Sequence, residues 1–337
     1  MDFVQFCKKL PKIELHAHIN GSISPQTMKE LVKRKKATKP ELADFSIPEG
    51  LEYITDFFPL FKFIYQLTDD EESVRLVTRR TIDEFAEDGV RYLELRSTPR
   101  ANPETGMTKE SYVASVLSVV NEPRQNIRVK LIISIDRRNT LEEAQEVVDL
   151  AIKFRDQGIV GIDLCGDVMV GSFDKLKPAF ERAKAEHFKI TLHFNEVKEN
   201  IPEAPSMLSV NPDRLGHATL LDDASRETIY KNQCPIEVCM TSNVLCKTVS
   251  SYEAHHVKDL LKQGHPFVLC TDDKGVFFSE LSNEYAKAGV AFDMTREQLF
   301  QASFQAIDAI FDDDRVKETL KQDWQTWRKL NQQEFSG

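Results

Sequence analysis

Two histidines on one face of a short strand are the first residues in this chain whose spacing suggests chemistry. His16 and His18 end the run Lys12–His18, which alternates polar and apolar residues as a β-strand does. Their Cα atoms would lie roughly 6.6 Å apart on the same face, close enough for both imidazoles to reach one metal ion. An H-x-H pair is weak evidence by itself. The alternative is a polar strand end with two hydrogen-bonded histidines.

The ends of later β-rich runs supply further candidate ligands. His193 ends one run and His217 ends another, and Glu196 follows His193 by three residues. The acidic pair Asp272 and Asp273 closes the last run. Four of the eight histidines therefore lie at strand ends, and the other four lie elsewhere: His187, His255, His256 and His265. This concentration favours a metal site over scattered structural histidines.

The candidate ligands are nitrogen and oxygen donors without sulfur: His16, His18, His193 and Asp272. Such a set is typical of a catalytic zinc ion that keeps a bound water. Zinc lowers the pKa of that water from 15.7 towards roughly 7, which makes hydroxide available at neutral pH. We therefore expect one Zn²⁺ per chain.

Three further side chains are candidates for the reaction itself. Glu196 is placed for proton transfer, and His217 for orienting the activated water. Asp273, next to a ligand, is suited to hold a ring nitrogen of a substrate. For Glu196 and Asp273 the alternative is a purely supporting role behind the metal ligands.

Eight β-rich runs alternate with helical patterns, which favours a closed (β/α)8 barrel, a TIM barrel in the α/β class, of the metal-dependent hydrolase type. The runs cover residues 12–18, 92–98, 130–136, 160–166, 189–195, 214–217, 235–241 and 266–272. Helix starts are indicated by Ser24 before Pro25 and by two capping boxes, Thr68 with Glu71 and Thr140 with Glu143. In such a barrel the functional groups lie at the carboxyl ends of the strands.

The spacing of the runs predicts one domain over residues 1–337 with two additions. A helical insertion at about 40–68, rich in phenylalanine, is expected over the barrel mouth, and extra helices are expected at about 279–330. Packing of these phenylalanines against the barrel alone is the alternative.

Composition restricts the partners. The formal charge of −10 disfavours a polynucleotide partner, while a small anionic ligand in a local positive pocket is compatible with it. No apolar run is long enough for a membrane span, and no secretory signal is recognisable. The six cysteines form no C-x-x-C pair and are expected to be reduced. We expect a cytoplasmic protein, monomeric, that binds a small molecule.

The same residues carry a resemblance to the adenosine and AMP deaminase family. The motifs are H-A-H with N-G-S (16–22), L-C-G-D (164–167), H-F-N-E (193–196), L-G-H (215–217) and T-D-D (271–273), and in order and spacing they cover nearly the whole chain. The stretches L-E-L-R-S-T-P-R (93–100), I-D-R-R (135–138), T-S-N-V (241–244) and T-D-D-K-G-V-F (271–277) resemble the adenosine deaminase-like branch, the N6-methyl-AMP deaminases.

The resemblance implies zinc on the four ligands named above, Glu196 as proton donor to the purine, and His217 as assistant to the activated water. It implies that Asp273 and the backbone of Gly166 each hold a ring nitrogen. Positions that match substrate contacts in the nucleotide branch are His18, Asn20, Ser97, Thr98, Pro99, Arg100 and Asp136. Tyr65, which stands where related sequences carry a histidine, is a further expected substrate contact.

Two departures from adenosine deaminases proper point to a phosphate on the substrate. Asn20 replaces an acidic residue, which removes repulsion, and Lys274 replaces a proline, which with Arg100 adds cationic donors. A solvent-facing Lys274 is the alternative. The expected reaction is hydrolysis of N6-methyl-AMP to IMP and methylamine. An adenosine deaminase, another amidohydrolase and a non-catalytic nucleotide-binding barrel are the competing hypotheses.

Overall fold

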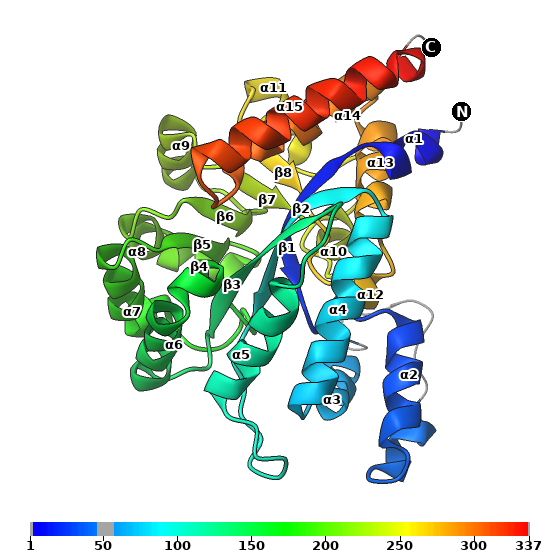
Figure 1. Ribbon diagram of the computed structural model, residues 1–337. Helices are drawn as coiled ribbons and strands as arrows, with labels where there is room; N and C mark the ends of the chain where they lie inside the picture. Colours follow the sequence, from blue (N-terminus) through cyan, green and yellow to red (C-terminus); the bar gives the residue numbers. More distant parts are fainter. Residues whose placement is uncertain (1–2, 46–56, 336–337) are drawn as a thin grey trace.

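The computed structural model describes residues 3–45 and 57–335 and contains an eight-stranded parallel sheet in which the strands follow one another in chain order. The strands are β1 (Lys12–His18), β2 (Val90–Ser97), β3 (Arg128–Asp136), β4 (Ile159–Cys165), β5 (Lys189–Phe194), β6 (Arg214–His217), β7 (Ile236–Val238) and β8 (Phe267–Leu269). The sheet closes where Ala17 of β1 forms a parallel bridge with Asp272, just after β8. The predicted (β/α)8 barrel is therefore confirmed (Figure 1).

Helices connect and cover the strands. The α-helices are α1 (Phe3–Lys9), α2 (Pro25–Lys35), α3 (Phe57–Leu67), α4 (Glu71–Glu87), α5 (Lys109–Val120), α6 (Leu141–Lys153), α7 (Phe173–Ala185), α8 (Ala204–Ser209), α9 (Asp223–Asn232), α10 (Met240–Leu245), α11 (Val257–Gln263), α12 (Lys274–Phe277), α13 (Leu281–Ala291), α14 (Arg296–Gln305) and α15 (Asp314–Leu330). Short 3-10 helices are η1 (Pro40–Asp44), η3 (Arg155–Gln157), η4 (Lys198–Glu203), η5 (Ala306–Ala309) and η6 (Gln332–Phe335).

The last two strands are shorter than the sequence predicts. β7 ends at Val238 because α10 begins at Met240, and β8 ends at Leu269. Asp272 has a φ of +64°, outside the extended range, so the chain leaves the strand conformation there. Both missing strand ends lie at the carboxyl end of the barrel, where irregular backbone places functional side chains.

Two of the three predicted helix starts are confirmed. Ser24 caps α2 with Pro25 in its first turn, and Thr140 forms a capping box with Glu143 at the start of α6. The capping box at Thr68 is wrong, because Asp70 accepts the cap hydrogen bond of α4 instead. The Thr68 hydroxyl donates to the carbonyl of Ile64, within the preceding helix.

The predicted insertion at 40–68 contains η1 and α3, and residues 46–56 lie outside the described part of the chain. After β8, α13, α14 and α15 follow in the predicted C-terminal region. In Figure 1 both chain ends lie at the top of the view and α2 and α3 at the bottom. A single domain stays a prediction. Within 3–45 and 57–335, we find no helix whose length and apolarity would let it cross a membrane.

Candidate active site

Four nitrogen and oxygen atoms converge at the carboxyl end of the barrel. The Nε2 atom of His193 lies 3.1 Å from Nε2 of His16 and 3.2 Å from Nε2 of His18. The Oδ1 atom of Asp272 lies 3.4 Å from each of the latter two nitrogens. Ligands placed tetrahedrally at zinc distances of about 2.0–2.2 Å would be roughly 3.3–3.5 Å apart. Four of the six distances between the predicted ligand atoms are therefore close to those around a single four-coordinate ion.

Barrel closure brings these ligands together from opposite ends of the chain. The pleat of β1 puts His16 and His18 on one side. The backbone N–H of His18 donates to the carbonyl of Asp272, and that of Asp272 donates to the carbonyl of His16, over 2.9 and 2.7 Å. Gly216 must be small, because a Cβ there would lie 2.9 Å from Cε1 of His16. This contact explains the glycine of the L-G-H motif.

Buried carboxylates orient the histidine ligands. Glu237 lies 2.8 Å from Nδ1 of His16, and Asp163 lies 3.1 Å from Nδ1 of His193. These bonds hold the protons on Nδ1 and leave the Nε2 lone pairs free for a metal. Arg96 bridges both carboxylates over 2.9 and 3.1 Å. Burial alone would raise the pKa of Glu237, but Arg96 and Arg214 hold it well below its usual range.

A second group of side chains is also able to hold a metal. His217 lies with His16, His193 and Asp272 so that one ligand atom of each falls within 4.8 Å of the others. The Nε2 atom of His217 is 3.9 Å from Oδ2 of Asp272, longer than the corresponding distances for His18. The shorter distances thus favour His18 as the fourth ligand.

Two carboxyl groups beside this centre have raised pKa values. Burial raises the pKa of Glu196, with a further contribution from Asp272 that His193 opposes. Burial and the nearby Asp272 and Glu196 raise the pKa of Asp273 well above its usual range. The buried Oδ1 of Asp273 has no hydrogen-bond partner within the described residues. A carboxyl group that keeps its proton can donate it to a ring nitrogen.

A cavity of about 550 Å³ opens in front of the ligands. The predicted site residues that line it are His18, Asn20, Tyr65, Ser97, Thr98, Arg100, Asp136, Gly166, His193, Glu196, His217, Asp272 and Asp273. Gly166 has a φ of +105°, and a Cβ there would lie 2.6 Å from Oδ1 of Asp136. Glycine at this position therefore allows the close approach of two parts of the cavity wall.

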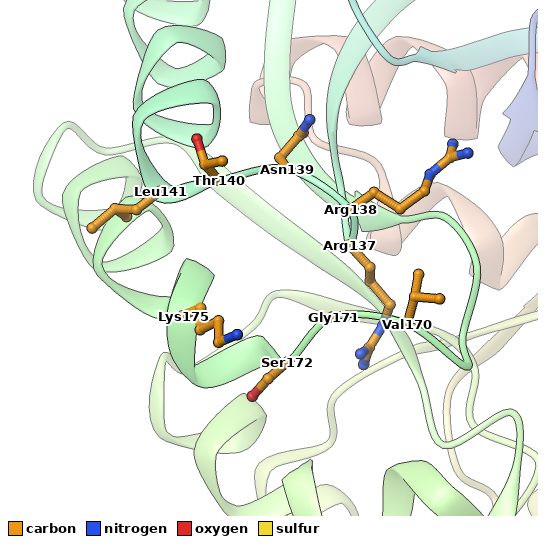
Figure 2. A pocket seen from close by; sticks show the side chains of 9 residues that line it. All are labelled: Arg137, Arg138, Asn139, Thr140, Leu141, Val170, Gly171, Ser172 and Lys175. Atoms are coloured by element: carbon orange, nitrogen blue, oxygen red, sulfur yellow. The ribbon is translucent and has the colours of Figure 1, made fainter.

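Sequence reasoning missed three cations on the cavity wall, Lys62 of α3, Arg96 of β2 and Arg138. Arg138 followed Asp136 in the I-D-R-R motif and now donates to both carboxylate oxygens of that residue, over 2.8 and 2.6 Å. It also borders an adjacent hollow, where Figure 2 shows its side chain extending away from Leu141 and Lys175. The available sequence signal for Arg138 was its place just after the end of a predicted strand.

Lys274 and Pro99 do not line the cavity, contrary to the contacts expected of them. Lys274 is 2% exposed, and its Nζ donates to Glu84 at 2.7 Å and to Glu280 at 3.2 Å. It starts the short helix α12, whose turn directs the side chain to α4 rather than to the cavity. Pro99 is buried without contributing to the wall.

We predict that Lys274→Met lowers stability and leaves substrate affinity unchanged. Removing a buried cation from two carboxylates should cost about 1.5–3 kcal/mol of unfolding free energy. Urea unfolding and Michaelis constants for a nucleotide would test this, with the exposed Lys36→Met as control. A tenfold rise in KM for the nucleotide at unchanged stability would contradict the assignment.

Comparison with known proteins adds a family to this geometry. The family model described as adenosine deaminase matches residues 11–327. A Danio rerio protein named N6-methyl-AMP deaminase is 43% identical over 341 residues, covering 97% of each chain. The crystal structure of the Arabidopsis N6-mAMP deaminase is 39% identical, with a TM-score of 0.90 over 96% of this chain and 99% of that chain. The Arabidopsis protein ADAL in complex with IMP is 38% identical, with a TM-score of 0.88 over 96% and 98%.

Proposed function

Because the chain belongs to the adenosine deaminase family, we propose that it is a zinc-dependent enzyme that hydrolyses N6-methyl-AMP to IMP and methylamine. The observation that carries the proposal is one cavity lined by three of the four predicted ligands, two protonatable carboxyl groups and four cations, Lys62, Arg96, Arg100 and Arg138. The relatives named N6-methyl-AMP deaminase and the IMP complex of a similar chain support the choice of substrate.

The purine ring would lie between the ligand cluster and the opposite wall. His16, His18, His193 and Asp272 would hold a zinc ion, which when bound would lower the pKa of its water to roughly 7. Glu196 would give its proton to N1 of the purine as the oxygen of the water adds at C6, and one proton of the water would replace it on Glu196. The other proton of the water would pass to the leaving nitrogen, so that methylamine departs and C6 keeps the oxygen as a carbonyl. Asp273 and the backbone N–H of Gly166 hold two further ring nitrogens and so fix the plane of the base. His217 orients the attacking oxygen.

The other end of the cavity is suited to a phosphate. Arg100 donates to the carbonyl and hydroxyl oxygens of Thr68 over 3.0 and 2.8 Å, and the hydroxyl lies 3.3 Å from Oδ1 of Asn20. The guanidinium carbon lies 4.5 Å from the ring centre of Tyr65. Its buried Nε has no partner within the described residues. An arginine held in place with a spare donor is well suited to bind a phosphate oxygen.

The experiment that tests this function is a substrate panel. We expect kcat/KM for N6-methyl-AMP to exceed the values for AMP, adenosine and N6-methyladenosine with the zinc-loaded protein. A preference for the nucleosides would favour an adenosine deaminase, and no turnover of any of the four would contradict the proposal.

Asn20→Asp should lower the activity on a substrate that carries a phosphate much more than the activity on a nucleoside. The new carboxylate is isosteric with the amide, and like charges brought together in a complex cost several kcal/mol. We therefore expect kcat/KM to fall by about 10²–10³-fold for N6-methyl-AMP and by less than about threefold for N6-methyladenosine. The same substitution at the exposed Asn232, at the end of α9, is the matched control. Equal losses for both substrates would overturn the placement of the phosphate.

A further inference from the structure

A chain of buried hydrogen bonds lies behind His217. The side-chain amide nitrogen of Asn243 is 3.0 Å from Nδ1 of His217. The amide oxygen of Asn243 is 3.1 Å from Nε2 of His255, and the backbone N–H of Val257 donates to Nδ1 of His255 over 3.4 Å. Asn243 and His255 are each only 1% exposed. Neither residue has a place in the reaction described above.

The direction of these bonds follows from their far end. A backbone N–H can only donate, so Nδ1 of His255 accepts from Val257 and the proton of the neutral ring is on Nε2. That N–H donates to the oxygen of Asn243, which turns the amide NH₂ towards His217. Nδ1 of His217 must then accept, and its proton is on Nε2. The orientation of the amide and both histidine tautomers are thus linked to one backbone group at the start of α11.

The remaining contacts of His217 agree with a proton on Nε2. This atom faces two carboxylate oxygens, Oε2 of Glu196 at 3.5 Å and Oδ2 of Asp272 at 3.9 Å. A nitrogen that carries a proton has no lone pair for a metal ion. These hydrogen bonds therefore exclude His217 from the metal ligands. While Asn243 donates to Nδ1 of His217, Nε2 keeps its proton, so His217 cannot replace His18.

The residues of this hydrogen-bonded series are also held in place by their surroundings. The backbone carbonyl oxygen of Asn243 accepts from the backbone N–H groups of Thr248 and Val249, over 3.0 and 3.1 Å. The ring of His255 stacks on that of His256 at 4.4 Å between centroids. His217 itself has a φ of +58°, so its backbone is in the left-handed region. A side chain whose backbone and ring nitrogen are both constrained has one orientation towards the cavity.

We propose that Asn243, held by His255, is a positioning residue that locks His217 in the Nε2–H tautomer, so that His217 donates to the attacking oxygen and stays out of the metal coordination. Asn243 acts through His217 and touches neither substrate nor metal. The tautomer assignment is independent of the substrate. Only its effect on turnover rests on the proposed function.

The tautomer is measurable by ¹⁵N NMR on the zinc-loaded protein with labelled histidines, and His217→Gln assigns the signals. We expect His217 to show a protonated Nε2 and an unprotonated, metal-free Nδ1. His265, whose Nε2 lies 2.8 Å from the carbonyl of Cys234, is the internal control in the same spectrum. A metal-bound Nε2 or a protonated Nδ1 on His217 would overturn the proposal.

Asn243→Asp keeps almost the same side-chain shape but favours the other tautomer of His217. A carboxylate still accepts from His255 but cannot donate, so the proton of His217 should move to Nδ1. Asn243→Leu removes both bonds and should leave a mixture of tautomers. For both variants we expect kcat to fall by about 10–100-fold with KM and zinc content near wild type, as for other residues that orient a functional histidine. Wild-type tautomers in both folded variants, or a loss confined to KM, would refute the positioning role.

Discussion

Replacing Glu196 by glutamine should lower kcat by about 10²–10⁴-fold and leave the zinc content of the protein unchanged. Glutamine has the shape of glutamate but cannot transfer the proton that N1 of the purine needs. Glu196 contributes none of the four predicted ligand atoms, four of whose mutual distances are 3.1–3.4 Å. Its replacement should therefore leave the positions of the ligands unchanged. Steady-state kinetics on N6-methyl-AMP and elemental analysis of the same samples test both parts of the expectation.

The matched control for this variant is Glu199→Gln, three residues further along and exposed on η4. It makes the same glutamate-to-glutamine change near the barrel mouth without touching the cavity and should keep wild-type kinetics. A Glu196→Gln enzyme with more than about one tenth of the wild-type kcat would contradict the proton-transfer role. Loss of zinc together with activity would instead place Glu196 among the residues that hold the metal.

The fold and the ligand cluster were predictable because both depend on local patterns. Alternation within each run identifies strands, and a barrel made of such units brings the carboxyl ends of its strands to one face. His16, His193 and Asp272 could therefore be grouped although they lie far apart in the chain. The alternation of polar and apolar residues in β1 did not reveal whether its polar face points into the barrel or towards solvent. Glu14 is fully buried inside the barrel, where a polar alternation is ordinarily taken for a solvent face.

Other features depend on contacts that no local pattern encodes. Lys274 follows Asp273 directly, yet the turn of α12 takes its side chain to Glu84 of α4. Asn243 lies in α10 and His255 in the segment before α11, and their link to His217 exists only once β6 and β7 are neighbours. Lys62 faces the cavity only because α3 packs over it. Each of these depends on the path of a connecting segment, which the sequence spacing leaves open.

Arg96→Met should give the largest loss of stability among the variants considered, roughly 3–5 kcal/mol of unfolding free energy. The guanidinium of Arg96 is fully buried between Asp163 and Glu237. Arg214 still donates to Glu237 over 2.7 Å in the variant, so the uncompensated charge falls mainly on Asp163. Removal of one partner from a buried ion network is costly because the remaining charge stays out of water.

The same substitution should weaken metal binding, because Asp163 and Glu237 are the groups that orient His193 and His16. We expect about 10–100-fold lower zinc affinity, measured by competition with a chelator, in addition to the shift in urea unfolding of the metal-free protein. Arg34→Met is the control, since among the described residues Arg34 makes only exposed ion pairs, with Glu30 and Glu72, and its loss should cost less than about 1 kcal/mol. If Arg96→Met unfolded at the wild-type urea concentration and kept wild-type zinc affinity, the barrel interior would not support the ligands in the way that its hydrogen bonds indicate.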